Sequence, residues 1–279
     1  MPESKGPLRI VEETPGYWRA IFDYPPFNIL DGALYAELQA LLDRMDASSS
    51  LRVVVFESAI PDFFLAHFDL TGKLGNITTA VGKTGLPVLT DTFVRLTRSP
   101  VASIAKIRGV ARGACSEFVL ACDMRFASRE KAVLGQPEVA VGLHPGGGAT
   151  ERLPPLVGRG RALEIILGGE DFDGPTAERY GYVNRALPDA ELDAFVHMFA
   201  RRLGSFDRQA IAAAKRLVNE VSLPASDQLL SGLNSFYTAL SWPESQRRVG
   251  ILLERGLQHD RDFERNWTEG LGSLLQGRE

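Results

Sequence analysis

The sequence predicts an α/β core followed by a C-terminal region that is helical throughout. Segments typical of β-strands alternate with amphipathic helical segments in the first part of the chain, which is the order expected of an α/β fold. The run 53–56 is fully apolar, as in strands that are buried on both faces of a parallel sheet. From Asp189 onward every segment has a helical pattern. We expect a core over residues 1–200 and a helical C-terminal subdomain over 201–279.

The segments before the centre of the chain alternate between β and α patterns. β-rich segments at 9–13 and 17–22 flank a Thr-Pro-Gly turn, which predicts a hairpin. Asp31 is a predicted N-cap. The helix that follows it has an apolar face formed by Leu34, Leu38, Leu41, Leu42 and Met45. Two further segments are a Gly- and Thr-rich stretch expected to be a mobile loop, 71–85, and a second amphipathic helix, 87–98.

The centre of the chain places two acidic residues next to turns made of small residues. An apolar strand over 101–107 leads through glycine-containing turns into a buried helix over 114–122. Glu117 lies one turn into that helix. Glu138 ends a tight Gly-Gln-Pro-Glu turn further along the chain, at 135–138. The pattern therefore predicts a strand, a turn and a helix that carries one acid, with a second acid on a later turn.

The start of the predicted helix is suited to binding an oxygen that gains negative charge. The first backbone N–H groups of a helix have no intrahelical partner and carry the positive end of the helix dipole. Gly113 and Ala114 are small enough to let a ligand oxygen approach these groups. Glu117 projects from nearly the same helical face as Ala114, where an acid could move protons next to a polarised carbonyl. The same residues also fit close helix–sheet packing, with an acid that only complements the dipole.

Glycine and proline divide the remainder of the chain into helices. The run 146–150 is rich in glycine but lacks the Lys-Ser/Thr ending of a phosphate-binding loop, so it is interpreted as a helix entry. Further helices are expected over 161–167 and 174–179, and 182–185 is expected to be extended. The helices of the C-terminal region are predicted over 190–205, 209–221, 226–240 and 245–256. Their apolar stripes are expected to need a partner surface and include Leu229, Leu230, Leu233 and Phe236.

Composition argues against several classes of function. The formal net charge of −4 gives no electrostatic reason to expect nucleic acid or an anionic membrane as a partner. No apolar run approaches the ~20 residues of a membrane span, and residues 1–10 lack the apolar core of a secretory signal. Cys115 and Cys122 are too far apart on their predicted helix for a disulfide, which favours a reducing, cytoplasmic compartment. The scattered His and Cys residues show no metal-ligand spacing.

Four motifs, in order, resemble those of the crotonase (enoyl-CoA hydratase/isomerase) superfamily. The stretch 64–70, Phe-Leu-Ala-His-Phe-Asp-Leu, resembles the family's F-x-A-G-A-D-L signature. The stretch 108–117, Arg-Gly-Val-Ala-Arg-Gly-Ala-Cys-Ser-Glu, resembles N-G-x-A-x-G-G-G-x-E, and Ala-Cys-Asp at 121–123 matches the A-C-D that usually follows. Gly-Gln-Pro-Glu at 135–138 matches G-x-P-E, with Leu-His-Pro after it matching L-x-P. The resemblance covers about residues 9–255.

The resemblance implies a fold, a substrate class and a set of site residues. The fold would be a crotonase-like ββα spiral core with a C-terminal helical trimerisation region, and the assembly a homotrimer or a hexamer. The substrate would be an acyl-CoA thioester, with coenzyme A as part of the substrate and no separate cofactor. The backbone N–H groups of Phe68 and Ala114 would form an oxyanion hole, and Glu117 and Glu138 would be the two acids of a hydratase. Substrate-binding positions would be Ala66, Asp69, Leu70 and Gly113, with the CoA adenine against the backbone from 66 to 70.

This sequence departs from the family pattern at the expected oxyanion site. His67 and Phe68 stand where the family has Gly and Ala, and Ala114 and Cys115 stand where it has two glycines. Because the oxyanion donors are backbone groups they survive these changes, but the added side chains are expected to narrow the acyl pocket. His67 is interpreted as a packing or hydrogen-bonding residue. Residues 256–279 extend past the usual family end.

Several alternatives stay open at this point. Glu138 could be a solvated turn acid, and Asp69 could be a helix cap. Arg95, Arg98 and Arg112 could be surface charges, although any one of them could instead meet a CoA phosphate. The function could also be another reaction of the same enolate, such as isomerisation, thioester hydrolysis or decarboxylation. A third alternative is a protein that binds acyl-CoA without turnover.

Overall fold

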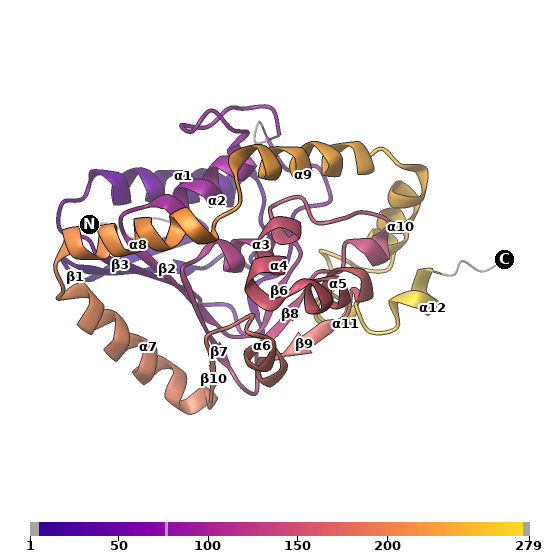
Figure 1. Ribbon diagram of the computed structural model, residues 1–279. Helices are drawn as coiled ribbons and strands as arrows, with labels where there is room; N and C mark the ends of the chain where they lie inside the picture. The colour runs from indigo at the N-terminus through magenta and orange to yellow at the C-terminus, as the bar shows by residue number, and fades with distance from the viewer. Residues whose placement is uncertain (1–5, 76–77, 276–279) are drawn as a thin grey trace.

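The computed structural model describes residues 6–75 and 78–275 and contains two β-sheets surrounded by helices (Figure 1). The larger sheet has six strands in the order β1-β2-β3-β5-β7-β10. Its strands are β1 (Leu8–Thr14), β2 (Tyr17–Phe22), β3 (Val53–Ser58), β5 (Ala102–Ile107), β7 (Met124–Ser128) and β10 (Arg185–Leu187). β1 and β2 form the predicted antiparallel hairpin, and the other neighbours pair in parallel.

The smaller sheet has four strands in the order β4-β6-β8-β9. They are β4 (Phe63–Leu65), β6 (Val110–Arg112), β8 (Val133–Gly135) and β9 (Asp171–Asp173), of which β9 alone runs antiparallel to its neighbour. The chain visits the two sheets alternately, because β3 is followed by β4, β5 by β6 and β7 by β8. Helices α2 (Val88–Arg98) and α3 (Ala114–Ala121) follow the first two of these strand pairs. The expected ββα spiral core is thereby confirmed.

Strand β3 shows why the central strands are apolar without alternation. Val53 and Val55 belong to a cluster formed with helix α7 (Asp189–Gly204) on one face of the larger sheet. Val54 and Phe56 belong to the main core on the opposite face. Figure 1 shows α7 on one side of this sheet, with α1 (Gly32–Ala47) and α2 on the other. Because both faces are covered, a polar side chain within 53–56 would be buried whichever face of the sheet it pointed to. Such burial is costly unless the polar group finds a hydrogen-bond partner.

The helices for which bounds were predicted agree closely with the structure. Asp31 caps α1 as expected, since its carboxylate accepts the backbone N–H groups of Ala33 and Leu34 at 3.0 Å each. The helices not yet named are α4 (Ala149–Val157), α5 (Arg159–Gly168), α6 (Gly174–Tyr180), α8 (Arg208–Ser222), α9 (Ser226–Ala239), α10 (Pro243–Glu254), α11 (Arg261–Asn266) and α12 (Leu271–Leu275). A short 3-10 helix, Val139–Val141, follows the Gly-Gln-Pro-Glu turn.

The extended segment predicted at 182–185 begins later than expected, since β10 starts only at Arg185. The backbone N–H groups of Tyr182 and Val183 both donate to the carbonyl of Ala177, at 2.8 and 3.2 Å. These bonds close the C-terminus of α6 after Gly181, whose φ of 80° suits glycine. The chain can therefore pair with β7 only after this turn is complete.

The prediction that the apolar stripe of α9 needs a surface from a partner chain is wrong. Leu229, Leu233 and Phe236 are buried within their own chain. Leu233 and Phe236 join the main core, and Leu229 packs with the neighbouring helix α2 in a small cluster that Leu230 borders. A helical stripe read from sequence does not specify which surface covers it.

Further observations concern the loop, the cysteines and the membrane. The described part of 71–85 contains no helix or strand, while residues 76 and 77 lie outside the described residues. Cys115 and Cys122 are both buried and unpaired, as expected. Within 6–75 and 78–275, none of the helices combines the length and the apolar character that crossing a membrane requires.

Candidate active site

The smaller sheet brings the predicted site residues together. Its strands β4, β6 and β8 are parallel neighbours, so their carboxyl ends lie along one edge. Phe68 comes shortly after β4, Ala114 and Glu117 come after β6, and Glu138 comes after β8. Segments distant in sequence therefore meet at this edge, where binding sites of parallel sheets are commonly found.

Backbone hydrogen bonds continue the pairing of these strands into the site. The N–H of Arg112 donates to the carbonyl of Ala66 at 3.0 Å, which joins the segment after β4 to the start of α3. The N–H of Gly113 donates to the carbonyl of Gly135 at 3.1 Å, which joins the start of α3 to the turn after β8. The positions of all three segments are therefore set by backbone groups and depend little on side-chain identity.

Phe68 and Ala114 both line the cavity, and their backbone N–H groups have no acceptor among the described residues. Ala114 is the first residue of α3, where an N–H has no intrahelical partner. Within the described residues, neither N–H donates to another backbone or side-chain group. Gly113, before the helix, has a φ of 54°, a conformation that favours glycine. Two free donors bordering one cavity can stabilise an oxygen that gains negative charge.

Glu117 is buried and held by the entry to helix α4. Its two carboxylate oxygens each lie 2.8 Å from the backbone N–H of Gly147, and Oε1 also accepts the N–H of Ala149 at 2.9 Å. Burial raises the pKa of Glu117 to about 7, although these hydrogen bonds and the nearby Arg152 act in the opposite direction. A carboxyl group with this pKa can accept or release a proton near neutral pH.

Glu138 is buried on the same cavity, which excludes the alternative of a solvated turn acid. Burial and then the charge of Glu117 raise its pKa well above the ordinary carboxyl value. With its amide nitrogen facing the acid, Gln136 donates to both oxygens of Glu138 at 3.2 Å. A methyl group at Gly113 would lie 3.0 Å from Glu138 Oε1, so the acid sits directly beside the start of α3. The site thus contains two buried acids whose pKa values are both raised, which suits acid–base catalysis near neutral pH.

The cavity between these groups is narrow and mostly apolar. Its volume is about 60 Å³, enough for a few water molecules and far below the roughly 300–1,000 Å³ of pockets that enclose drug-sized ligands. The ring of Phe68 lies 6.5 Å from that of Phe236, and both border the cavity. The apolar wall is completed by Leu70, Leu89, Val141, Leu143 and Trp267. Phe68 therefore narrows the pocket in the way its sequence position suggested.

The expected substrate-binding residues do not all reach the cavity. Leu70 and Gly113 line it, whereas Ala66 and Asp69 are buried outside it. Asp69 is not a helix cap. Its carboxylate accepts the backbone N–H groups of Thr71 and Lys73, at 3.3 and 2.6 Å, and so closes a turn.

Two of the three arginines considered for CoA phosphate are neither surface charges nor accessible. Arg112 is fully buried and donates to both carboxylate oxygens of Asp171, at 2.8 and 2.6 Å. Arg95 is buried and paired with Asp43 at 2.7 Å. Arg98 is exposed, which agrees with the interpretation of a surface charge. Because the guanidinium groups of Arg112 and Arg95 are buried and paired within the fold, they are not accessible to a CoA phosphate.

Sequence reasoning missed the contribution of the C-terminal segment to the site. Trp267 lines the cavity, although it lies past the expected family end. His67 Nε2 forms an ion pair with Glu264 Oε1 at 2.9 Å, and both residues are buried. Gln258 accepts the backbone N–H of Leu70 at 3.0 Å. The departure from glycine at His67 was the one sequence signal that pointed here, but it does not identify the partner.

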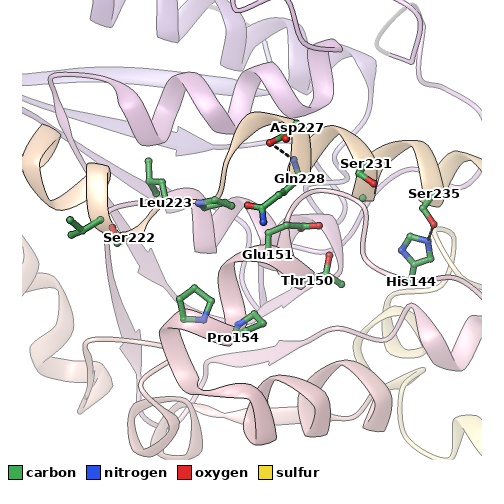
Figure 2. A pocket seen from close by; sticks show the side chains of 14 residues that line it. His144, Thr150, Glu151, Pro154, Ser222, Leu223, Asp227, Gln228, Ser231 and Ser235 are labelled. Atoms are coloured by element: carbon green, nitrogen blue, oxygen red, sulfur yellow. Dashed lines mark hydrogen bonds between the residues drawn. The ribbon is translucent and has the colours of Figure 1, made fainter.

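A larger groove, of about 950 Å³, lies between α4 and α9 (Figure 2). His144 points toward α9, and its Nε2 lies 2.9 Å from Ser235 Oγ. Glu151 borders the groove, and burial raises its pKa. Neither of the two predicted acids and neither free N–H group borders this groove. The two predicted acids and the two free N–H groups therefore all border the narrower cavity.

Comparison with known proteins places the chain among relatives of similar length. The family described as enoyl-CoA hydratase/isomerase matches residues 19–256. A Streptomyces avermitilis protein proposed to be an enoyl-CoA hydratase is 40% identical, with 100% of each chain covered and a TM-score of 0.91. DspI of Pseudomonas aeruginosa is 28% identical, with 86% of this chain and 97% of that chain covered and a TM-score of 0.70. An enoyl-CoA hydratase of Bacillus anthracis is 26% identical over 89% of this chain and 96% of that one, with a TM-score of 0.70.

Proposed function

The chain belongs to the enoyl-CoA hydratase/isomerase family of the crotonase superfamily, and we propose that it adds water across the double bond of an α,β-unsaturated acyl-CoA thioester. The observation that carries this proposal is one narrow cavity bordered by two buried acids and two free backbone N–H groups. Coenzyme A is part of the proposed substrate, and the reaction needs no separate cofactor. The family supplies the substrate class, and the two acids favour hydration.

The two backbone donors would polarise the thioester. Its carbonyl oxygen would accept hydrogen bonds from the N–H groups of Phe68 and Ala114. As water attacks the β-carbon, the π electrons move toward the α-carbon and the carbonyl oxygen gains negative charge. Fixed donors in a cavity with little water stabilise that charge without having to reorganise. Loss of one such donor typically costs about 10²–10³-fold in turnover.

The two acids would move the protons of the added water. Glu117 acts as base, taking a proton from water while the oxygen bonds to the β-carbon. Glu138, whose raised pKa favours the protonated form, gives its proton to the α-carbon, which restores the thioester. One proton is taken up and one is released, so the net addition is a single water molecule. Proton exchange with solvent then returns both groups to their starting state.

Crotonyl-CoA provides the direct test. The purified protein is expected to remove the enoyl absorbance of crotonyl-CoA and to form a hydroxyacyl-CoA. An equilibrium mixture approached from the hydroxyacyl side would support the same assignment. Unchanged crotonyl-CoA at micromolar enzyme, together with no other hydrated enoyl-CoA, would overturn the proposal.

Double-bond isomerisation is the second candidate, because the cavity has room for few water molecules. A single acid that gives a proton at one carbon and regains it at another would need no water. An isomerase would convert a 3-enoyl-CoA to its 2-enoyl isomer without forming a hydroxyacyl product. Chromatography of the products formed from both enoyl isomers separates the two reactions.

We also propose a homotrimer, stacked into a hexamer, in the cytoplasm. Helix α8 supports an assembly, because Leu217, Val218 and Val221 on it are 54%, 61% and 88% exposed. Apolar side chains that are this exposed and this close together are typical of a protein interface. Two buried, unpaired cysteines are consistent with a reducing compartment.

A further inference from the structure

One wall of the narrow cavity comes from the far end of the chain. Trp267, between α11 and α12, borders the cavity beside His67 and Phe68, and only 4% of it is exposed. Its ring centroid lies 6.2 Å from that of His67, at an interplanar angle of 72°. The guanidinium carbon of Arg112 lies 5.7 Å from the same indole ring. The indole therefore contacts one side chain from each of the two predicted oxyanion segments.

Buried polar contacts hold this C-terminal segment in place from the N-terminal side of Trp267. Glu264 forms the ion pair with His67 and also accepts the backbone N–H of Gln258 at 2.8 Å. Arg112 donates to the backbone carbonyls of Glu264 and Arg265, at 2.9 and 2.7 Å. Each of these groups would be costly to leave unpaired in the interior. These contacts therefore fix the position of the C-terminal segment at the site.

A hydrogen bond from the residue that follows Trp267 in the chain also anchors the segment. Thr268 Oγ1 donates to Asp171 Oδ2 at 2.6 Å, and Asp171 is the residue that pairs with Arg112. Trp267 consequently has anchored residues before and after it in the chain. These bonds fix the backbone on both sides of Trp267 and so hold its large, rigid indole at the cavity.

We propose that Trp267 is a specificity-determining residue that closes the cavity and restricts the enzyme to thioesters with a small acyl group. The inference rests on the proposed function, because the reacting carbons must lie between the two acids and the two free N–H groups. All acyl atoms beyond the reacting carbons must then fit in the remainder of this narrow cavity, which Trp267 borders. In this proposal His67 and Glu264 are positioning residues, which act through Trp267.

The test compares a short and a long substrate in variants of the full chain. In Trp267→Ala, the ratio of kcat/KM for 2-decenoyl-CoA to that for crotonyl-CoA is expected to rise at least about tenfold, because pocket contacts discriminate by roughly 10–200-fold per methylene. Trp267→Phe should give a smaller rise. Trp242→Ala is the matched control, because Trp242 is 47% exposed and does not border the cavity. An unchanged ratio in a folded Trp267→Ala protein would overturn the proposal.

The positioning role has its own readout. Glu264→Ala should raise the same ratio, by less than Trp267→Ala, whereas Glu264→Gln should keep part of the selectivity by retaining a hydrogen-bonding side chain. Equal loss of both activities in Glu264→Ala, with the ratio unchanged, would show that the pair only stabilises the fold. It would remove His67 and Glu264 from the proposal.

A binding measurement separates this inference from the proposed reaction. Calorimetric titration with the saturated thioesters butyryl-CoA and decanoyl-CoA needs no turnover. Wild type is expected to bind butyryl-CoA more tightly, and Trp267→Ala to gain affinity for decanoyl-CoA. This result in a protein without hydratase activity would support the role of Trp267 and contradict the proposed reaction. Hydration of crotonyl-CoA by a wild-type protein that binds both thioesters equally would support the proposed reaction and contradict the role of Trp267.

Discussion

The carboxylate of Glu117 spans the backbone N–H of Gly147, with both of its oxygens 2.8 Å from that nitrogen. This contact places a buried acid from α3 against the amino end of α4, where the dipole favours negative charge. It also explains why a glycine stands at 147. A Cβ there would lie 2.6 Å from Glu117 Oε2 and 3.1 Å from Phe93 Cε2.

Gly147→Ala is therefore expected to displace Glu117 and to lower kcat. Misplacement of a catalytic group by about 1 Å can cost on the order of 10²-fold. Gly160→Ala is the matched control, because no atom lies within 4 Å of a Cβ added at Gly160 in helix α5. Crotonyl-CoA turnover and circular dichroism of both variants provide the measurement. A Gly147→Ala protein as active as Gly160→Ala would show that the position of Glu117 is not critical.

Glu138→Gln is expected to remove most of the hydratase activity and to leave CoA thioester binding intact. The amide keeps the shape of the side chain but cannot exchange a proton at the α-carbon. A general acid–base group typically contributes about 10²–10⁴-fold. Turnover of crotonyl-CoA and titration with butyryl-CoA are the two measurements. Near-normal turnover would indicate that Glu138 is buried for structural reasons alone.

Ala114 tests the oxyanion hole through its backbone. Ala114→Pro removes the N–H at the first position of α3, where proline is tolerated, and should reduce turnover by about 10²–10³-fold. Ala114→Gly keeps the N–H and should retain activity, or increase it by relieving crowding at the thioester. Circular dichroism and oligomer size establish that the proline variant is folded. Hydration at a normal rate by folded Ala114→Pro would place the charge-stabilising group elsewhere.

The raised pKa values predict a bell-shaped dependence of kcat/KM on pH. Glu117 must be ionised to act as base, so activity should rise with pH through an apparent pKa near its value of about 7. Glu138 must be protonated to act as acid, so activity should fall at higher pH, where its raised pKa is exceeded. Because the acids interact, both limbs belong to the pair. A rate that is constant between pH 6 and pH 9 would contradict these roles.

The protein is expected to have the mass of a trimer or a hexamer at micromolar concentration, and this mass should not change with protein concentration. Val221→Asp places a charge on the exposed apolar face of α8 and should weaken the assembly, because a charge buried at an interface without a partner is costly. Light scattering after size-exclusion chromatography measures both proteins. Met198→Asp is a control on α7, where Met198 is exposed as well. A stable wild-type monomer would contradict the proposed oligomer.

Local chemistry was sufficient to predict most of the elements of this fold. The N-cap at Asp31, the apolar run of β3 and the glycine after α6 each act over a few residues, so their consequences can be deduced from neighbouring side chains. The motifs around Ala114 and Glu138 identified the family in the same way. The sequence alone also indicated that Phe68 would crowd the site, because its side chain replaces a smaller one in the family pattern.

Only the tertiary structure decided which distant groups share the site. Pairing of β4, β6 and β8 joins Phe68, Ala114 and Glu138, and the burial that follows raises the pKa of both acids. Trp267 and Phe68 line the same cavity, although they lie 199 positions apart in the sequence (267 − 68 = 199). No periodicity encodes such a contact, because it depends on the path of the whole chain. Burial and long-range pairing are properties of the folded molecule, and they determine the chemistry of these side chains.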